Sequence, residues 1–202
     1  MTRRLDFAGV LAALGRGDVV ALPTDTVYGV AASLSRPEAV AALFTLKRRP
    51  ESVALPILIE GTDSLTTLGV TFDERATRLA ARFWPGPLTI IASAPAQLAR
   101  VVRSSRDVVG VRVPNDATVL TLLRESGPLV VTSANEHGAP PCTSAAEVLA
   151  TFEGRDELFG VFDDGTRNAA VSSVIDVSGP NVRVLRLGAI SEEELLDELS
   201  RA

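Results

Sequence analysis

The segment Asp18-Val-Val-Ala-Leu-Pro-Thr-Asp-Thr-Val-Tyr-Gly29 decides the fold class of this chain. Its first half, residues 18–22, is a short apolar run typical of a buried strand. Its second half, residues 23–29, is a polar segment closed by a glycine. Open α/β sheets place ligands at strand ends, so this loop is a candidate binding segment. From composition alone, however, a turn whose Thr and Asp side chains bond their own backbone is the better explanation.

Beyond this segment, apolar runs bounded by turn residues alternate with helical patterns, which is typical of an α/β sheet protein. Capping boxes at 35–38, 144–147 and 191–194 mark helix starts. After residue 158, three strand candidates follow one another without helices, so we expect a mixed sheet. We expect strands at 18–22, 55–59, 88–93, 108–113, 128–132, 158–162, 173–177 and 182–187, and helices at 5–14, 35–46 and 73–83 and from 116, 144 and 191 onward.

Length and composition predict one globular domain over residues 1–202. The 202 residues are 46% hydrophobic and 22% charged, without repeats, low-complexity linkers or a shift in composition. No apolar stretch approaches the roughly 18 residues of a membrane span, and Asp6 stands where a secretory signal would be apolar. We therefore expect a cytoplasmic protein with no membrane association. The single cysteine, Cys142, excludes an internal disulfide and a multi-cysteine zinc site.

The charge balance disfavours an extended nucleic-acid surface. The formal net charge is −5, whereas long RNA is usually bound by a basic face that neutralises phosphates. An acidic chain can still hold one basic pocket, so small phosphorylated ligands remain open. Of the 20 Lys and Arg residues, only Lys47 is a lysine. The bias suggests that an ammonium is required there, although chance at an exposed helix end is the simpler explanation.

Lys47-Arg-Arg-Pro50 is a candidate for phosphate chemistry. Pro50 disfavours helical geometry in the residue before it, so a helix must end here. In an extended segment Lys47 and Arg49 share one face while Arg48 points away, and such a pair suits phosphate or carboxylate oxygens. A basic last turn that compensates the helix macrodipole explains the same residues equally well.

Polar segments also follow later strand candidates. Thr132-Ser-Ala-Asn135 offers hydroxyl and amide groups. His137 has no nucleophile, orienting carboxylate or metal-ligand spacing beside it, which favours a surface histidine. Further on, Asp163-Asp-Gly-Thr-Arg167 contains a turn, and Ser172 precedes a strand. Arg186 lies inside an otherwise apolar strand, where its charge requires a partner or a ligand.

Absent motifs narrow the chemistry further. The sequence holds no P-loop, no G-x-G-x-x-G after a strand, no G-x-S-x-G, no H-E-x-x-H and no EF-hand pattern. Hydride transfer on a dinucleotide fold, serine hydrolysis and zinc hydrolysis therefore lack support. We expect no metal held by protein side chains.

Taken together, the polar segments resemble the YrdC/TsaC family of L-threonylcarbamoyladenylate synthases, in its short form without an extra C-terminal domain. Each motif alone is weak, but seven occur in the family's order over nearly the whole chain. Lys-x-Arg and Ser-x-Asn are the family's signature. The motifs are Pro23-Thr-Asp-Thr-Val-Tyr-Gly29, Lys47-x-Arg49-Pro50, Phe83-Trp-Pro-Gly-Pro-Leu-Thr89, Val111-Arg112-x-Pro114, Thr132-Ser-Ala-Asn135-x-x-Gly138, Ser172-Ser-Val-Ile-Asp176 and Leu185-Arg-x-Gly-Ala-Ile190.

The resemblance implies an α/β fold, a single-domain twisted mixed sheet flanked by helices with a concave ligand pocket. It implies a nucleotidyltransferase that joins L-threonine, bicarbonate and ATP into L-threonylcarbamoyl-AMP, the first step of N6-threonylcarbamoyladenosine (t6A) formation in tRNA. Mg²⁺ would accompany ATP through phosphate oxygens. A separate tRNA threonylcarbamoyl transferase complex would use the product. The carbamate itself attacks the α-phosphate, so the reaction needs no protein nucleophile.

Carried over position by position, the resemblance assigns roles to eight residues. Lys47 and Arg49 are the expected catalytic residues, which would bind the ATP phosphates and the carbamate. The remaining assignments are Thr26 and Ser172 for threonine, Arg112 for the threonine carboxylate, and Ser133, Asn135 and Arg186 for the nucleotide.

Five positions differ from the family pattern, and two other functions remain open. The differences, which leave reduced activity or another amino-acid preference open, are at Val53, Leu58, His137, Pro141 and Asn168. One alternative function is RNA binding in ribosome maturation, where weak direct binding would suffice. The other is a paralogue that binds a nucleotide without turning it over.

Overall fold

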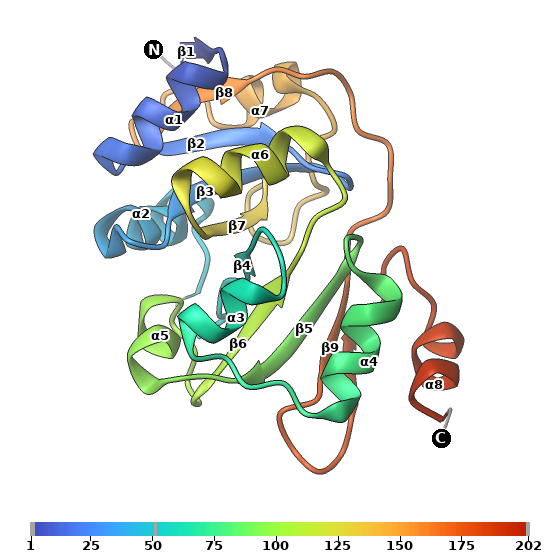
Figure 1. Cartoon of the computed structure of the whole chain (residues 1–202). Helices are drawn as coiled ribbons and strands as arrows, with labels where there is room; N and C mark the ends of the chain where they lie inside the picture. The colour runs from blue at the N-terminus through green and yellow to red at the C-terminus, as the bar shows by residue number, and fades with distance from the viewer. Residues whose placement is uncertain (1–2, 51, 201–202) are drawn as a thin grey trace.

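In the computed structural model, which describes residues 3–50 and 52–200, a ten-stranded sheet carries helices on both faces (Figure 1). The strand order is β1-β8-β2-β3-β7-β4-β6-β5-β9-β10. Four strand pairs are parallel and five are antiparallel. The expected mixed sheet is therefore confirmed.

The strands and helices alternate along much of the chain, as the sequence pattern predicted. The strands are β1 (Arg3–Leu5), β2 (Val19–Pro23), β3 (Tyr28–Ser33), β4 (Ile57–Leu58), β5 (Leu88–Ser93), β6 (Val108–Arg112), β7 (Leu129–Ser133), β8 (Leu158–Phe162), β9 (Ser173–Asp176) and β10 (Arg183–Arg186). The helices are α1 (Phe7–Arg16), α2 (Pro37–Lys47), α3 (Asp63–Leu68), α4 (Glu74–Phe83), α5 (Ala96–Val101), α6 (Ala117–Ser126), α7 (Ala145–Thr151) and α8 (Glu192–Ser200).

The side chains of β2 explain why helices cover both faces of the sheet. Val20 and Leu22 pack with residues of α1 and α6, whereas Val19 and Ala21 belong to a second cluster with residues of α2 and α7. Successive side chains of a strand point to opposite faces, so an uninterrupted apolar strand needs cover on both sides. Figure 1 shows α1 and α6 together over the end of the sheet that contains β2.

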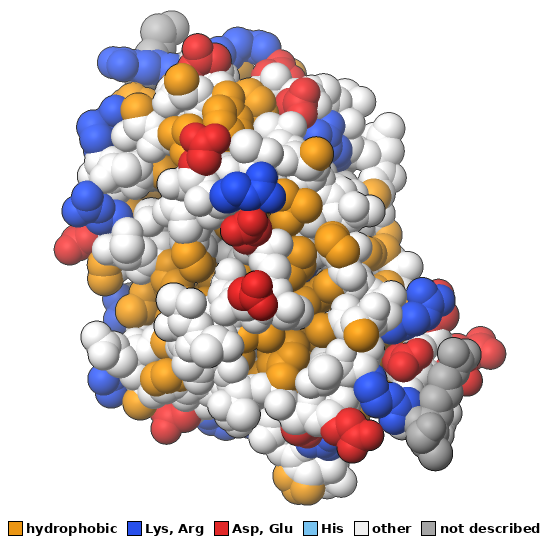
Figure 2. Space-filling model, in the orientation of Figure 1, with side chains coloured by type: hydrophobic (Ala, Val, Ile, Leu, Met, Phe, Trp, Pro, Cys, Tyr) orange, Lys and Arg blue, Asp and Glu red, His pale blue; other side chains and the backbone are white. Residues whose placement is uncertain are grey.

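A third apolar cluster lies at the other end of the sheet, where α4 and α8 pack on β5 and β9. Leu79 of α4 and Leu195 of α8 are fully buried there against Ile90 and Ile175. On the face drawn in Figure 2, acidic and basic side chains are interspersed among apolar ones, without a field of one sign. Within the described ranges, every helix is too short or too polar to cross a bilayer.

Side-chain caps begin the helices at four of the predicted positions. Asp73 accepts a hydrogen bond from the backbone of Ala76 at 2.9 Å, and Asp116 accepts one from Val119 at 3.0 Å. Ser144 and Ser191 cap α7 and α8 in the same way. These caps satisfy amide groups that have no partner inside the helix.

The predicted capping box at residues 35–38 is wrong. The helix begins at Pro37, and its N-cap residue, Arg36, makes no side-chain cap. The Ser35 hydroxyl bonds instead to the Ser33 hydroxyl at 2.9 Å. Proline at the first helical position has the required φ and lacks one of the unpaired amides, so the helix start depends less on a side-chain cap.

Several elements differ from the sequence expectation. Residue Leu5 belongs to β1, and α1 continues through Gly15 to Arg16. The expected strand at 55–59 is reduced to Ile57–Leu58. The elements β1, β3, α3 and α5 were not predicted. The small residues of β3 weaken its strand signal, yet they are required by packing, since a Cβ on Gly29 would lie 2.7 Å from Val131 Cγ1.

Gly188 lies where the chain after β10 passes the segment before β9. A Cβ at this position would lie 2.0 Å from the carbonyl oxygen of Val171, so the backbone would have to move. The Gly188 amide also donates to the Ser173 hydroxyl at 2.9 Å. We expect Gly188→Ala to lower the free energy of unfolding by about 2 kcal/mol or more, measured by urea denaturation.

Gly179→Ala is the matched control, because a Cβ at Gly179 meets no atom within 4 Å. We expect its free energy of unfolding to stay within about 0.5 kcal/mol of the unsubstituted protein. Similar losses in the two variants would show that the close approach at Gly188 is not the cause.

Candidate functional site

The predicted polar segments converge on one cavity of about 450 Å³. They come from distant parts of the chain and meet across the central strands of the sheet. Of the eight predicted site residues, Lys47 and Asn135 stand behind the cavity wall. The six that line it are Thr26, Arg49, Arg112, Ser133, Ser172 and Arg186.

The lining of this cavity is strongly positive. Among the described residues that line it, four are arginines and none is Asp or Glu. The fourth arginine, Arg106, is 2.9 Å from the buried Asp176 carboxylate. The other three face the cavity together, which makes the site attractive to anions.

Lys47 is the last residue of α2, and its side chain is only 1% exposed. Its ammonium donates to the carbonyl oxygen of Ser133 and to Asn135 Oδ1, the latter at 3.1 Å. The Ser133 hydroxyl donates to the same amide oxygen at 2.6 Å. The Lys-x-Arg and Ser-x-Asn motifs are therefore joined by direct hydrogen bonds.

Burial and the neighbouring positive charge of Arg49 lower the pKa of Lys47 from 10.5 to about 7. Both of its hydrogen-bond acceptors are neutral groups, so they satisfy the donors without cancelling the charge. A nearby anion would favour the charged ammonium.

Arg48 and Arg49 point in different directions, as the sequence predicted. Arg48 takes the left-handed conformation that ends the helix, and its side chain is 69% exposed. Arg49 turns back toward the cavity, where its guanidinium donates to the carbonyl oxygens of Val53 at 2.9 Å and Ala54 at 3.2 Å. Burial, and then the charge of Arg186, lower the pKa of Arg49.

Arg112 ends β6 and contacts the loop between β2 and β3. Its guanidinium donates to Gly86 O at 2.9 Å, to Thr26 Oγ1 at 3.4 Å and to Asp25 Oδ1 at 2.5 Å. The Arg112 and Asp25 side chains are 7% and 9% exposed. Burial lowers the pKa of Arg112, and Asp25 partly restores it.

Arg186 closes the cavity from the edge strand β10. Its guanidinium donates to both the carbonyl oxygen and the hydroxyl of Ser172 at 2.9 Å. The Ser172 hydroxyl also lies 3.2 Å from the hydroxyl of Thr89. The strand β10 is largely exposed, Arg186 included, so the expectation that this charge lies within an apolar strand is wrong, and its partner is a neutral serine. Partial loss of solvent around the guanidinium, and then the charge of Arg112, lower the pKa of Arg186.

The four cations influence one another in a series. The charge of Arg49 lowers the pKa of Lys47, the charge of Arg186 lowers that of Arg49, and the charge of Arg112 lowers that of Arg186. Within the described part of the chain, Arg112 alone of the four has a carboxylate partner. An anion with several charged oxygens would relieve this repulsion, so the geometry fits a polyphosphate or a carboxylate.

The residues that differ from the family pattern fall in two groups. Val53 and Leu58 line the cavity. His137, Pro141 and Asn168 are not among its lining residues, and His137 is exposed, as the sequence predicted. Only the first group belongs to the cavity lining.

Sequence reasoning assigned no role to several residues that complete the site. Asp25 is the counter-ion of Arg112, and Gly86 supplies a carbonyl acceptor. Both lie inside motifs that the sequence offered, so their involvement could have been anticipated. The ion pair of Arg106 with Asp176 joins residues 70 positions apart, so no local sequence pattern predicts it.

In the described ranges, no group of three or more His, Cys, Asp and Glu side chains could hold a metal ion. The cavity offers guanidinium, hydroxyl and amide groups instead. These groups bind and orient anionic and polar ligands.

Comparisons with known proteins show which chains this one is similar to. A model of the Sua5/YciO/YrdC family, described as "Telomere recombination", matches residues 12–188. A threonylcarbamoyl-AMP synthase of Pyrococcus abyssi (strain GE5 / Orsay) is 38% identical over 181 residues, 89% of this chain and 53% of the relative. The threonylcarbamoyl-AMP synthase of Bacillus subtilis (strain 168) is 35% identical over 191 residues, 93% of this chain and 55% of the relative.

The crystal structure of P. abyssi Sua5 complexed with L-threonine is similar with a TM-score of 0.88 and 34% identity, over 99% of this chain and 60% of that one. The chain thus spans about half the length of these two curated relatives. The matches confirm the resemblance to the YrdC/TsaC family and the α/β fold class inferred from the sequence.

The lowered pKa of Lys47 makes stability depend on pH. Between pH 7 and 10.5 the unfolded chain keeps a proton that folded Lys47 has lost, so stability rises with pH in this window. We expect the free energy of unfolding of the unsubstituted protein to rise relative to Lys47→Met, by up to about 1.4 kcal/mol per pH unit. Urea denaturation of both proteins at a series of pH values measures this difference. A difference that stays constant with pH would contradict the burial of a titrating ammonium.

Proposed function

This chain belongs to the Sua5/YciO/YrdC family, and we propose that it forms L-threonylcarbamoyl-AMP from L-threonine, bicarbonate and ATP. The observation that carries the proposal is a cavity lined by Arg49, Arg112 and Arg186, with the buried Lys47 behind its wall. Within the described residues, Arg112 alone of these four cations pairs with a carboxylate. The names of the P. abyssi and B. subtilis relatives support it, as does the L-threonine bound to P. abyssi Sua5.

In the proposed reaction, the amine of threonine adds to the carbon of bicarbonate, and loss of water leaves an N-carboxylate. An oxygen of this carbamate attacks the α-phosphorus of ATP. The bond from the α-phosphorus to the bridging oxygen breaks, and pyrophosphate leaves with the electron pair. The protein needs to hold three reactants in line and to stabilise negative charge, so it requires no nucleophilic side chain.

We assign the phosphates and the carbamate to Lys47 and Arg49, because Arg49 lines the cavity, Lys47 lies behind the part of the wall formed by Ser133, and neither has a carboxylate partner among the described residues. Ser133 and Asn135 hold the Lys47 ammonium and would meet the nucleotide with it. Charge neutralisation at positions where charge develops is among the largest catalytic effects available to enzymes.

We assign the amino acid to the part of the cavity between Thr26, Arg112 and Ser172. The Arg112 guanidinium would bind the threonine carboxylate, and the two hydroxyls would bind its polar groups. Arg186 bonds Ser172 and stands between the two subsites, so it would contact the nucleotide. All four residues line the cavity.

We propose that Mg²⁺ binds together with ATP, because the phosphate oxygens and water provide the ligands that this ion prefers. Its charge would offset that of the polyphosphate. A transferase complex that places the threonylcarbamoyl group on tRNA adenosine would consume the product, which makes this reaction the first step of t6A formation.

Pyrophosphate release tests the proposed reaction. We expect the chain to release pyrophosphate from ATP and bicarbonate when L-threonine is present, with little release when it is omitted or replaced by L-serine. Isothermal titration with ATP, carried out in parallel, reports binding without turnover. Bound ATP without threonine-dependent release would contradict the proposal and indicate a nucleotide-binding protein without this activity.

Lys47→Ala tests the assignment of the ammonium. We expect at least about a hundredfold loss of turnover, because one preorganised electrostatic contact is removed. Lys47→Arg should not restore the full rate, because the buried site fits a compact ammonium.

Arg48→Ala is the matched control, since Arg48 is adjacent in sequence but is largely exposed, with a 3.7 Å ion pair to Glu136 at the surface. We expect its turnover to stay within about twofold of the unsubstituted protein. Unchanged turnover in Lys47→Ala would remove this residue from the catalytic assignment.

A further inference from the structure

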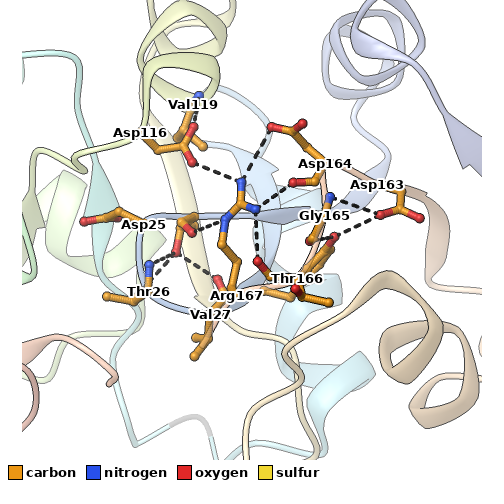
Figure 3. Close-up of polar contacts among 12 residues, drawn as sticks. Asp25, Thr26, Val27, Asp116, Val119, Asp163, Asp164, Gly165, Thr166 and Arg167 are labelled. Atoms are coloured by element: carbon orange, nitrogen blue, oxygen red, sulfur yellow. Dashed lines mark hydrogen bonds and ion pairs between the residues drawn. The ribbon is translucent and has the colours of Figure 1, made fainter. Parts of the chain in front are cut away.

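Arg167 lies in the connection between β8 and β9 and reaches the loop between β2 and β3 (Figure 3). Its Nε donates to the carbonyl oxygen of Thr24 at 2.9 Å. Its Nη1 donates to Asp164 O at 2.6 Å, and its Nη2 lies 3.3 Å from Asp116 Oδ2. With a side chain only 19% exposed, Arg167 ties three segments of the chain together at one point.

The segment that carries Arg167 is itself fastened. The Arg167 amide donates to Thr143 O at 2.8 Å, and the hydroxyl of buried Tyr28 donates to Gly165 O at the same distance. Asp116, the acceptor on the far side, is held as the cap of α6. The backbone that carries the Arg167 guanidinium is therefore held in place by hydrogen bonds, and so is the Asp116 acceptor.

The turn that Arg167 holds is built around Thr24. The Thr24 hydroxyl accepts the Thr26 amide at 3.2 Å, lies 3.0 Å from the Thr26 hydroxyl, and donates to Val27 O at 2.8 Å. These bonds make the turn internally rigid. Arg112 holds the turn from the cavity side through Asp25 and Thr26, and the bond from Arg167 to the Thr24 carbonyl holds it from the other side.

The same turn presents the groups proposed to bind the amino acid. Thr26 Oγ1 accepts from Arg112, and Asp25 is the carboxylate partner of Arg112. Arg167 is not among the residues that line the cavity. Any effect it has on a ligand must therefore pass through Thr24 to Thr26 and Asp25.

We propose that Arg167 is a positioning residue that fixes the turn of residues 24–27, so that Thr26 and the Asp25–Arg112 pair meet the amino-acid substrate in one geometry. The identity of that substrate rests on the proposed function. The planar fork of arginine suits this task, because its separate nitrogens reach a carbonyl and a carboxylate at once. A single lysine ammonium cannot bond both Thr24 O and Asp116.

Hydrogen–deuterium exchange of the turn tests the positioning without using activity. We expect the amides of residues 24–28 to exchange about tenfold faster in Arg167→Ala, because the turn loses its anchor at Thr24 and keeps only the bonds from Arg112 on the cavity side. The bonds from Thr24 N to Val27 O and from Thr26 N to Thr24 Oγ1 supply protected amides to follow. Unchanged exchange over this segment would overturn the proposal.

Steady-state kinetics test the consequence for the substrate. In Arg167→Ala we expect the KM for L-threonine to rise roughly tenfold and the KM for ATP to stay within about twofold, because the turn faces only the amino-acid subsite. Equal rises in both KM values would indicate a general loss of structure and overturn the proposal. Arg167→Lys, which keeps the charge near Asp116, should show an intermediate KM for threonine. Recovery of the original value by lysine would show that the fork is not required.

Arg75→Ala is the matched control. The Arg75 guanidinium also clasps a loop, donating to the carbonyl oxygens of Val177, Gly179 and Pro180, away from the cavity lining. We expect it to leave the exchange of residues 24–28 and both KM values unchanged, and equal effects in this variant would overturn the proposal.

Two further outcomes of these experiments have a defined meaning. If Arg167→Ala does not fold, Arg167→Lys is measured against the same criteria, and unchanged exchange and KM in it count against the proposal. If the unsubstituted protein shows no threonine-dependent pyrophosphate release, the proposed function fails. The exchange data alone then decide whether Arg167 fixes the turn.

Discussion

The removal of several cations from solvent around one cavity, with their mutual repulsion second to it, is the constraint on which the local structure depends. Desolvation disfavours the charged form of each of these cations, which are Lys47, Arg49, Arg186 and Arg112. The protein satisfies their donors mainly with neutral oxygens from carbonyl, hydroxyl and amide groups. In the described ranges, no buried side-chain nitrogen or oxygen lacks a hydrogen-bond partner. The buried donors are therefore satisfied, but their positive charge is not neutralised. A cavity of this kind favours an anionic ligand over a neutral one.

The supports around the cavity follow from this constraint. Neutral acceptors such as Ser133 O and Ser172 O must be held at fixed positions, and the ends of β7 and β9 provide them. Among the described residues, Asp25 is the one carboxylate in direct contact with these cations, and it lies on a turn that is bonded within itself and to Arg167. Catalysis by electrostatic preorganisation needs such rigidity, because groups that reorient during the reaction lose much of their effect. The same frame explains how a chain of negative net charge can present a positive cavity.

Much of the fold was predictable from local patterns. Asp73 and Asp116 cap helices where the sequence placed them, because a cap depends on residues within one turn. The buried strand at residues 18–22 was predictable from its apolar run. The strand β3 was missed because Gly29, Ala31 and Ala32 within it have low strand propensity. A glycine is favoured at position 29 by the close approach of Val131 on β7. The expected box at Ser35 failed because a neighbouring hydroxyl took its hydrogen bond.

The sequence by itself determined the fold class, the motifs of the site and the opposite directions of Arg48 and Arg49, because each depends on residues that are close along the chain. Only the tertiary structure decided which of these groups touch. It set Lys47 against Asn135, gave Arg186 a serine as its partner, and made Arg167 the link between two distant loops. The physical reason is that charge and desolvation act through space. The pKa of an ammonium depends on what surrounds it, and its surroundings are assembled from segments that lie far apart in the chain.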